Sequence, residues 1–259
     1  MLDGKVAVVT GSSRGVGYGI AEELAAARAT VVITGVDPSR AEKAASVIAE
    51  THKTPSAGYA VDVRERGQIE DLRAKIVDRF GRVDILVNNA GVETIGLVTE
   101  LTDEDWDYVF DINMKGVFRC CQVFARQMIE QGQGGKIINI SSVGGKLGFP
   151  YRSHYCASKA AVNCFSRVIA KELIPYGIAV NCICPGTVRT DLLDYVASWE
   201  AEQLGKTAEE VIQKWIEEIP LGRAIESREI GKVVVYLASD TTNAVIGQVI
   251  NVDGGISPF

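Results

Sequence analysis

The feature of this sequence that most constrains its fold is a regular alternation of short apolar runs with longer Ala-, Leu- and Glu-rich stretches. Apolar runs that end in glycine or polar residues predict strands buried on both faces. The stretches between them predict helices, and strands that alternate with helices form right-handed βαβ units around a parallel sheet. We predict seven strands, at residues 5–10, 30–35, 57–63, 83–88, 135–141, 178–184 and 248–252.

The helices predicted between these strands cover both faces of the sheet. They lie at residues 18–28, 38–52, 68–80, 102–130, 153–176 and 227–239, with a further helical excursion over about 190–219. No linker, charge block or repeat interrupts the pattern. We therefore predict a single α/β domain over residues 1–259.

Charge and cysteine content exclude several classes of protein. The chain has 27 Lys and Arg against 33 Asp and Glu, a net charge of −6, so it lacks the positive field that binds nucleic acid. No apolar run is long enough to span a membrane, and no secretory signal opens the chain. Six cysteines without a CxxC spacing and only two histidines argue against a metal site. Reduced, buried cysteines indicate a cytoplasmic protein. With nucleic acid, membrane and metal excluded, the expected partner is a small-molecule substrate.

A glycine-rich turn follows the first predicted strand. Its spacing, Gly11, then Gly15 and Gly17, permits a tight turn and close approach of a ligand to the backbone. The N-terminus of the next helix offers free N–H groups to a pyrophosphate. Many strand–helix turns contain glycine, so this turn alone leaves a purely structural role open.

A tyrosine and a lysine share one face at the start of the helix predicted at 153–176. Tyr155 and Lys159 lie four residues apart. The pKa of a tyrosine is normally about 10, and a nearby ammonium group lowers it, so the pair could serve as a general acid or base. By itself such a spacing also fits an ordinary surface pair. Ser142, which ends a strand, and Asn113, in the preceding helix, converge on the same edge of the sheet.

These motifs together resemble the short-chain dehydrogenase/reductase family, and the resemblance covers essentially the whole chain. Asn88-Asn89-Ala90-Gly91 resembles the family's motif after the fourth strand, and Val252-Asp253-Gly254-Gly255 its C-terminal signature. The resemblance implies a Rossmann-type, doubly wound sheet. It identifies four catalytic residues, Asn113, Ser142, Tyr155 and Lys159. It also implies that the cofactor contacts Gly11, Ser13, Arg14, Gly15, Val16, Gly17, Gly35, Asp37, Asp62, Val63, Asn89, Ala90, Gly91, Tyr155, Lys159, Pro185, Gly186, Val188 and Thr190.

The same resemblance implies a reaction: hydride transfer between a nicotinamide cofactor and a secondary alcohol or ketone, without a metal. Tyr155 would exchange a proton with the substrate oxygen, and Ser142 would hold that oxygen. Lys159 would bind the nicotinamide ribose and lower the pKa of Tyr155. Asn113 would hold a water molecule that connects Lys159 to solvent.

The choice between NAD and NADP depends on the end of the second strand. NAD enzymes usually carry an acid there, whereas this chain has Gly35. Arg14 is suited to a 2′-phosphate, but Asp37 is positioned either to reach the ribose or to cap the next helix. We expect NADP(H), with NAD(H) as the alternative.

The predicted substrate site suits a small polar molecule, since Glu93 and His154 favour hydroxyl groups over a long acyl chain. Gly144 and Gly145 would leave room beside the reacting carbon. The resemblance also implies that residues 187–222 form a lid over the substrate, and Leu192 would contact the substrate from this lid. A sugar, polyol or acyloin is the expected substrate. A 3-oxoacyl thioester reductase and a catalytically silent nucleotide sensor remain as alternatives, and the intact tetrad argues against the sensor.

The resemblance also implies a homotetramer, since family members commonly associate through two long helices. Here the helices at 102–130 and 153–176 carry apolar residues on more than one face, which suits a buried interface. Residues 256–259 are expected to reach a neighbouring subunit.

Overall fold

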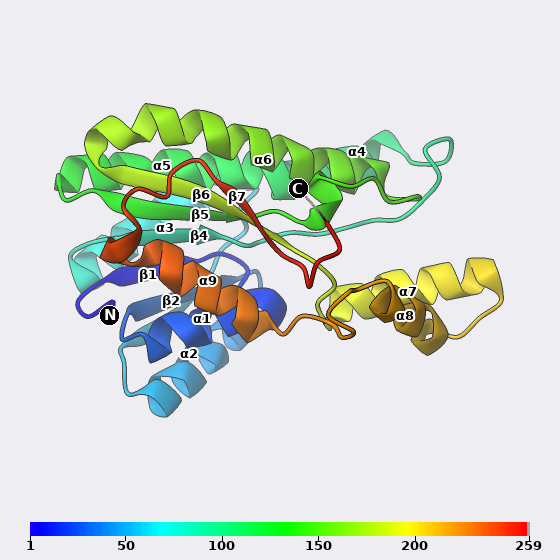
Figure 1. Cartoon of the computed structure of the whole chain (residues 1–259). Coiled ribbons are helices and arrows are strands. Elements are labelled where there is room, and N and C mark those ends of the chain that lie inside the picture. The colour runs from blue at the N-terminus through cyan, green and yellow to red at the C-terminus, as the bar shows by residue number, and fades with distance from the viewer. Residues whose placement is uncertain (258–259) are drawn as a thin grey trace.

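The computed structural model describes residues 1–257, in which seven strands form one parallel sheet in the order β3-β2-β1-β4-β5-β6-β7 (Figure 1). Every neighbouring pair is parallel. The strands are β1 (Val6–Val9), β2 (Thr30–Gly35), β3 (Ser56–Ala60), β4 (Ile85–Asn88), β5 (Gly135–Ile140), β6 (Ile178–Pro185) and β7 (Val249–Val252). The strand order reverses between β1 and β4, and ligands bind at such a switch point in open α/β sheets.

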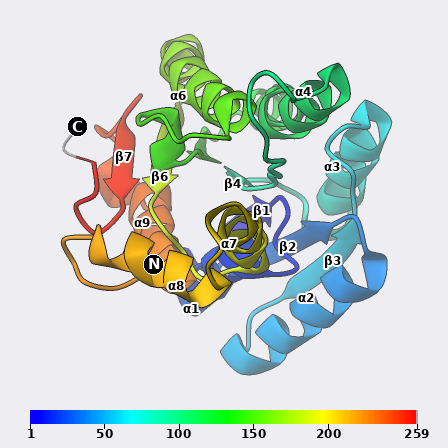
Figure 2. The same cartoon turned by 90° about the vertical axis from the view of Figure 1, so that its right-hand side faces the viewer.

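Helices cover both faces of this sheet, which explains why β1, β4 and β6 are buried along their whole length. One layer contains α1 (Gly15–Ala26), α2 (Pro38–His52) and α9 (Ser227–Ala238), and the other contains α3 (Arg66–Phe80), α4 (Asp103–Phe110), α5 (Val117–Gln131) and α6 (Ser153–Leu173) (Figure 2). The predicted seven-stranded, Rossmann-type single domain is thus confirmed. Residues 258 and 259, part of the tail expected to reach a neighbour, lie outside the described residues.

Two predicted elements differ from the structure. The third strand ends at Ala60, so Asp62 and Val63 lie in the loop beyond it. The helix predicted over 102–130 begins at its Thr102 capping box, but a π-helical segment, Asp111–Gly116, separates α4 from α5. Single π-helical turns are rare and occur frequently at functional sites, and this one carries Asn113.

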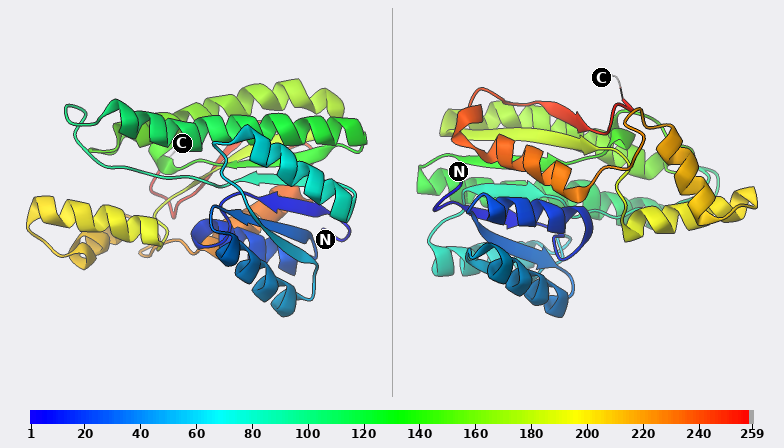
Figure 3. Two further views of the ribbon diagram at one scale, coloured as in Figure 1. Left: turned by 180° about the vertical axis from the view of Figure 1, so that it is seen from behind. Right: turned by 60° about the horizontal axis from the view of Figure 1, so that its bottom comes forward.

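The segment predicted as a lid forms a helical hairpin, α7 (Asp191–Leu204) and α8 (Ala208–Glu217), which projects from the carboxyl edge of the sheet (Figure 3). Its two helices pack on each other through a small cluster of their own, Ala197, Ala201, Val211 and Ile212. The Thr190 side chain caps the start of α7, and a capping box at Thr207 marks the start of α8. The hairpin is therefore held together largely by its own contacts. Within residues 1–257, no helix is both long and apolar enough to cross a bilayer.

Candidate active site

A single large cleft of about 1290 Å³ opens at the carboxyl edge of the sheet. The loops that follow β1, β2, β4, β5 and β6 form its walls, and the α7–α8 hairpin covers one side. Ligand pockets for drug-sized molecules span roughly 300–1000 Å³, so the cleft has room for a dinucleotide together with a small substrate.

The glycine-rich turn forms the floor of the cleft at the switch point. Gly11 and Gly15 have φ angles of 61° and 60°, which favour glycine. A Cβ on Gly11 would lie 2.8 Å from the Cα of Ala90, so the two loops are in direct backbone contact. Helix α1 begins at Gly15, and no side chain within residues 1–257 caps its first turn. These free N–H groups fit a cofactor pyrophosphate.

Tyr155 and Lys159 lie on the first turns of α6, where both line the cleft. The Lys159 ammonium is 5.7 Å from the centre of the Tyr155 ring, and its Nζ donates a hydrogen bond to the Ile140 carbonyl at 3.1 Å. Lys159 is only 5% exposed, and its burial lowers its pKa to about 8. It is therefore a buried cation whose charge is easily lost, and it fits the predicted ribose-binding position.

The pKa of Tyr155 is shifted upward in the structure, contrary to the expected lowering by Lys159. Burial is the main cause, the charge of Glu93 adds to it, and Ser142 and Arg152 oppose it. A raised pKa keeps the hydroxyl protonated but makes it a weaker proton donor, so this burial opposes the acid–base role predicted for Tyr155.

Ser142 and Ser141 both follow β5, but their hydroxyl groups face different surroundings. The Ser141 hydroxyl donates to the Lys159 carbonyl at 2.9 Å and is buried. The Ser142 hydroxyl accepts from the Gly144 N–H at 3.0 Å. A Cβ on Gly144 would lie 3.4 Å from both Ser142 Oγ and a ring carbon of Tyr155, so the two catalytic candidates flank Gly144. This arrangement favours Ser142, as predicted.

Asn113 is fully buried and is fixed by the loop after β4. Its Oδ1 accepts from the Val92 N–H at 2.8 Å, and its Nδ2 donates to the Val92 carbonyl at 2.9 Å and to Ser158 Oγ at 3.1 Å. Both amide donors are thus in use, and only Oδ1 has a lone pair left. Asn113 Oδ1 and Lys159 Nζ each lie 3.3 Å from the position that a Cβ on Gly91 would occupy.

Comparisons with known proteins agree with this geometry. Residues 11–257 match a family model described as enoyl-(acyl carrier protein) reductase. The 3-oxoacyl-[acyl-carrier-protein] reductase FabG of Thermotoga maritima is 37% identical, with 98% of each chain covered. Galactitol 2-dehydrogenase of Agrobacterium fabrum is 36% identical, again with 98% of each covered. The chain belongs to the short-chain dehydrogenase/reductase family.

Solved structures of short-chain dehydrogenases/reductases have the same fold. A short-chain type dehydrogenase/reductase from Mycobacterium marinum has a TM-score of 0.90 at 32% identity, covering 100% of this chain and 97% of its own. NAD⁺-bound xylitol dehydrogenase has a TM-score of 0.93 at 29% identity, covering 98% and 99%. Members of this family use NAD or NADP, and the chain is accordingly an oxidoreductase that acts on alcohol or keto groups.

Most of the residues predicted to bind cofactor or substrate line the cleft of this short-chain dehydrogenase/reductase. They are Gly11, Ser13, Arg14, Gly15, Val16, Gly35, Asp62, Val63, Asn89, Ala90, Gly91, Glu93, Pro185, Gly186, Val188, Thr190 and Leu192. Gly17 lies behind this lining, where a Cβ would lie 2.5 Å from the Gly11 carbonyl oxygen, so it permits α1 to pack against the turn.

Besides Gly17, four predicted contacts lie outside the lining of the cleft: Asp37, Gly144, Gly145 and His154. Gly144 is buried beside Ser142 and Tyr155. Asp37 caps α2 by accepting from the Arg40 N–H at 3.2 Å. Gly145 gives room to α6, because a Cβ there would lie 2.8 Å from the Lys159 carbonyl carbon. His154 is fully buried and bonds Thr94 Oγ1 through Nε2 at 2.6 Å. These residues shape the protein around the site, and their contacts with cofactor or substrate stay predictions.

One residue that lines the cleft, Arg64, was not among the predicted contacts. Arg64 forms a bidentate ion pair with Asp62, which holds the pKa of that carboxyl below its usual range. Arg152 pairs with Glu93, and Trp215 of α8 lies beside it. The contacts of Arg152 with Glu93 and Trp215 join segments far apart in the sequence, and no spacing rule signals them.

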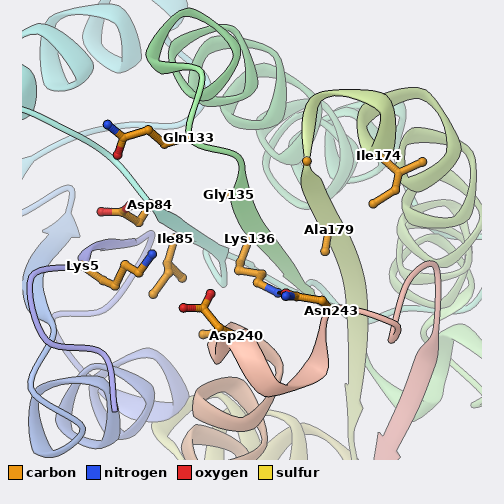
Figure 4. Close-up of a pocket in the computed structure, with 12 residues that line it drawn as sticks. Lys5, Asp84, Ile85, Gln133, Gly135, Lys136, Ile174, Ala179, Asp240 and Asn243 are labelled. Carbon is orange, nitrogen blue, oxygen red and sulfur yellow. Dashed lines mark hydrogen bonds between the residues drawn. The ribbon is translucent and has the colours of Figure 1, made fainter.

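A second, smaller cavity of about 300 Å³ lies at the opposite end of the sheet (Figure 4). Lys136 is directed into it and donates to Asn243 Oδ1 at 2.7 Å, while Lys5, Asp84 and Asp240 lie around it. None of the catalytic candidates lines this cavity. Within residues 1–257, no group of three or more His, Cys, Asp or Glu side chains is suited to hold a metal ion.

Proposed function

We propose that this protein interconverts a secondary alcohol and a ketone on a small polar substrate, such as a sugar, a polyol or an acyloin. The observation that carries the proposal is the polar wall of the cleft that Tyr155 also lines, where the buried side chain of Glu93 and the partly buried side chain of Arg152 lie 3.5 Å apart. An acyl chain would leave the two charged groups without hydrogen-bond partners, which is energetically costly. Substrate hydroxyl groups can form hydrogen bonds with both. The relatives named galactitol and xylitol dehydrogenase support the same substrate class.

The chain's own residues would manage the proton and the substrate oxygen. The Tyr155 hydroxyl donates a proton to the carbonyl oxygen in reduction and recovers it in oxidation, while Ser142 donates a hydrogen bond to the same oxygen. The bound nicotinamide supplies or accepts the hydride. Lys159 holds the ribose, and the free lone pair of Asn113 Oδ1 holds a water molecule that passes protons from solvent.

For the cofactor we propose a preference for NADP(H). Gly35 at the end of β2 carries no acid to repel a 2′-phosphate, and Arg14 lines the same part of the cleft. The Arg14 guanidinium is paired with Asp191 at the start of α7 and would exchange this partner for the phosphate. A kcat/KM for NADPH at least about tenfold above that for NADH would support the proposal, and the reverse order would refute it.

A second candidate is a 3-oxoacyl-thioester reductase. The specific observation in its favour is that several relatives at 33–37% identity carry that name. The carrier protein that such an enzyme meets would need a basic docking surface, and the net charge of the chain is −6. We rank this candidate second.

A substrate panel tests the two candidates together. Sugars, polyols, acyloins, diketones and an acetoacetyl thioester are supplied with NADPH or NADP⁺, and nicotinamide absorbance is followed. Faster turnover of polyols or acyloins supports the first candidate, and faster reduction of the thioester supports the second. Tight cofactor binding without any turnover would refute both and leave the nucleotide sensor.

We further propose that the protein is a cytoplasmic homotetramer. All six cysteines are free thiols, which fits a reducing compartment. The outer surfaces of α5 and α6 expose apolar side chains that suit subunit contacts.

A further inference from the structure

The side of the cleft next to Tyr155 contains an ion pair that the catalytic tetrad does not use. Glu93 follows β4 in the loop held by Asn113, and Arg152 directly precedes α6. Both residues line the same cleft as Tyr155. The pair is therefore positioned to contact the part of a substrate next to its reacting carbon.

Glu93 is incompletely satisfied in this position. Its side chain is 4% exposed, and within residues 1–257 its Oε1 atom has no hydrogen-bond partner. Arg152 Nε lies 3.5 Å from Oε1, which gives an ion pair without the geometry of a hydrogen bond. Burial raises the pKa of Glu93 to about 7, although Arg152 and Lys159 oppose the shift. A buried carboxyl group without a hydrogen bond is costly, and a ligand that donates one would remove that cost.

Arg152 is held by aromatic rings on two sides. Its guanidinium lies 5.7 Å from the centre of the Phe149 ring and 5.4 Å from that of Trp215 in α8. Cation–π contacts of this kind fix the plane of a guanidinium and leave its N–H groups free to donate. Because Trp215 belongs to the hairpin, the lid itself helps to position Arg152.

The backbone on both sides of the pair is also tightly constrained. Tyr151 has a φ of 66°, which is costly for a residue other than glycine. Its carbonyl accepts from the Gly96 N–H at 3.0 Å, and its ring packs 5.1 Å from that of Trp199 in α7. The Val92 N–H and carbonyl, next to Glu93, are both bonded to Asn113. A strained, well-anchored turn that presents a buried charge is typical of a recognition site.

We propose that Glu93 and Arg152 together recognise a hydroxyl group on the carbon next to the reacting one, so that the substrate is a vicinal diol or an α-hydroxyketone. A hydroxyl group donates one hydrogen bond and accepts others, which matches a carboxylate acceptor beside a guanidinium donor. A methylene group would satisfy neither partner. A substrate carboxylate would pair with Arg152 and would be repelled by Glu93.

This inference rests on the proposed function and narrows its substrate class. The test uses the reduction of two ketones that share one carbon skeleton, 3-hydroxybutan-2-one and butan-2-one, by the wild-type protein. We expect kcat/KM for the hydroxyketone to exceed that for butan-2-one at least about 100-fold, because an analogue that leaves buried polar groups unpaired is strongly rejected. Equal values would overturn the inference and leave the proposed alcohol–ketone chemistry intact. Reduction of an acetoacetyl thioester alone would refute both.

Variants separate recognition from the intrinsic reactivity of the two ketones. In Glu93→Ala the ratio of kcat/KM for hydroxyketone to butan-2-one should fall at least about tenfold, and Arg152→Met should lower it similarly. Glu93→Gln keeps an acceptor and should retain more of the ratio than Glu93→Ala. Glu100→Gln makes the same chemical change at an exposed position of the same loop and serves as the control. An unchanged ratio in Glu93→Ala and Arg152→Met would refute the assignment even if both proteins fold normally.

Discussion

At the scale of single residues, the proton held by Tyr155 is the feature on which the chemistry depends. Burial raises its pKa, so the hydroxyl stays protonated at neutral pH but gives up its proton less readily than an ordinary tyrosine. Tyr155→Phe removes the donor and little volume. We expect kcat for ketone reduction to fall about 10³-fold, the range typical of losing a general acid.

The control for Tyr155→Phe is cofactor binding, measured by fluorescence titration with NADPH. Its Kd should stay near the wild-type value because the phenyl ring preserves the wall of the cleft. Wild-type turnover in the variant would remove Tyr155 from the mechanism.

The buried carboxyl of Glu93 should make the stability of the fold depend on pH. Its pKa is raised to about 7 in the folded protein, against 4.5 for an ordinary Glu, so the folded state binds its proton more tightly. Its contribution to stability is thus fully present below about pH 4.5 and is lost as pH rises through about 7. By this shift, ionisation costs about 3 kcal/mol above neutral pH.

Glu93→Gln cannot ionise and should escape this cost. In urea unfolding at about pH 5 and about pH 8, the variant should gain stability relative to wild type at the higher pH, by up to about 3 kcal/mol. The same difference between variant and wild type at both pH values would mean that Glu93 keeps an ordinary pKa.

At the scale of elements, the π-helical segment Asp111–Gly116, between α4 and α5, is hydrogen-bonded to the loop that carries Glu93. Asn113 in this segment forms hydrogen bonds with both the N–H and the carbonyl of Val92. Asn113→Ala would leave both backbone groups without these partners. We expect a loss of about 2 kcal/mol or more in the free energy of unfolding, measured by urea titration.

Asn113→Asp is the matched variant, because its carboxylate still accepts from the Val92 N–H but cannot donate to the carbonyl. Its second oxygen would face the Val92 carbonyl in a fully buried position, so its stability should be no higher than that of Asn113→Ala. If Asn113→Ala were as stable as wild type, the loop would not depend on this contact.

The sequence predicts most of the helices and strands, but few of the side-chain contacts between them. Buried apolar runs identify the strands, because a parallel sheet covered on both faces needs them. The four candidate catalytic residues were predicted from the resemblance to the family, and the spacing of Tyr155 and Lys159 correctly placed these two side chains near the start of one helix. The break at 111–116 was not predicted, since its cause is the contact of Asn113 with a loop that precedes α4 in the chain.

The contacts of the cleft wall were predicted less well for the same reason. His154 and Gly145 both lie in the predicted segment, but His154 hydrogen-bonds Thr94 and Gly145 packs against the backbone of α6. Tertiary packing decides which side of each segment faces the cleft. The pairing of Glu93 with Arg152 joins residues that no local pattern relates.

At the scale of the whole molecule, the outer surface of α5 and α6 is more apolar than a solvent-exposed surface needs to be. Phe118 of α5 is 39% exposed and Val168 of α6 is 49% exposed, and Phe165 connects the two helices through an edge-to-face contact with Phe118. Figure 1 shows the two helices lying side by side along one side of the sheet. Exposed apolar surface of this kind commonly marks a subunit contact.

If this surface joins two copies of the chain, a charge placed at its centre should separate them. The wild type should have four times the mass of one chain by light scattering after size exclusion, and Val168→Glu should have half of that mass or less, because a buried unpaired carboxylate is strongly unfavourable. Val47→Glu makes the same change on α2, in the opposite helix layer, where the side chain is 42% exposed, and should remain tetrameric. A tetramer that survives Val168→Glu would place the contacts elsewhere, and a monomeric wild type would show that the α5–α6 surface is exposed in solution.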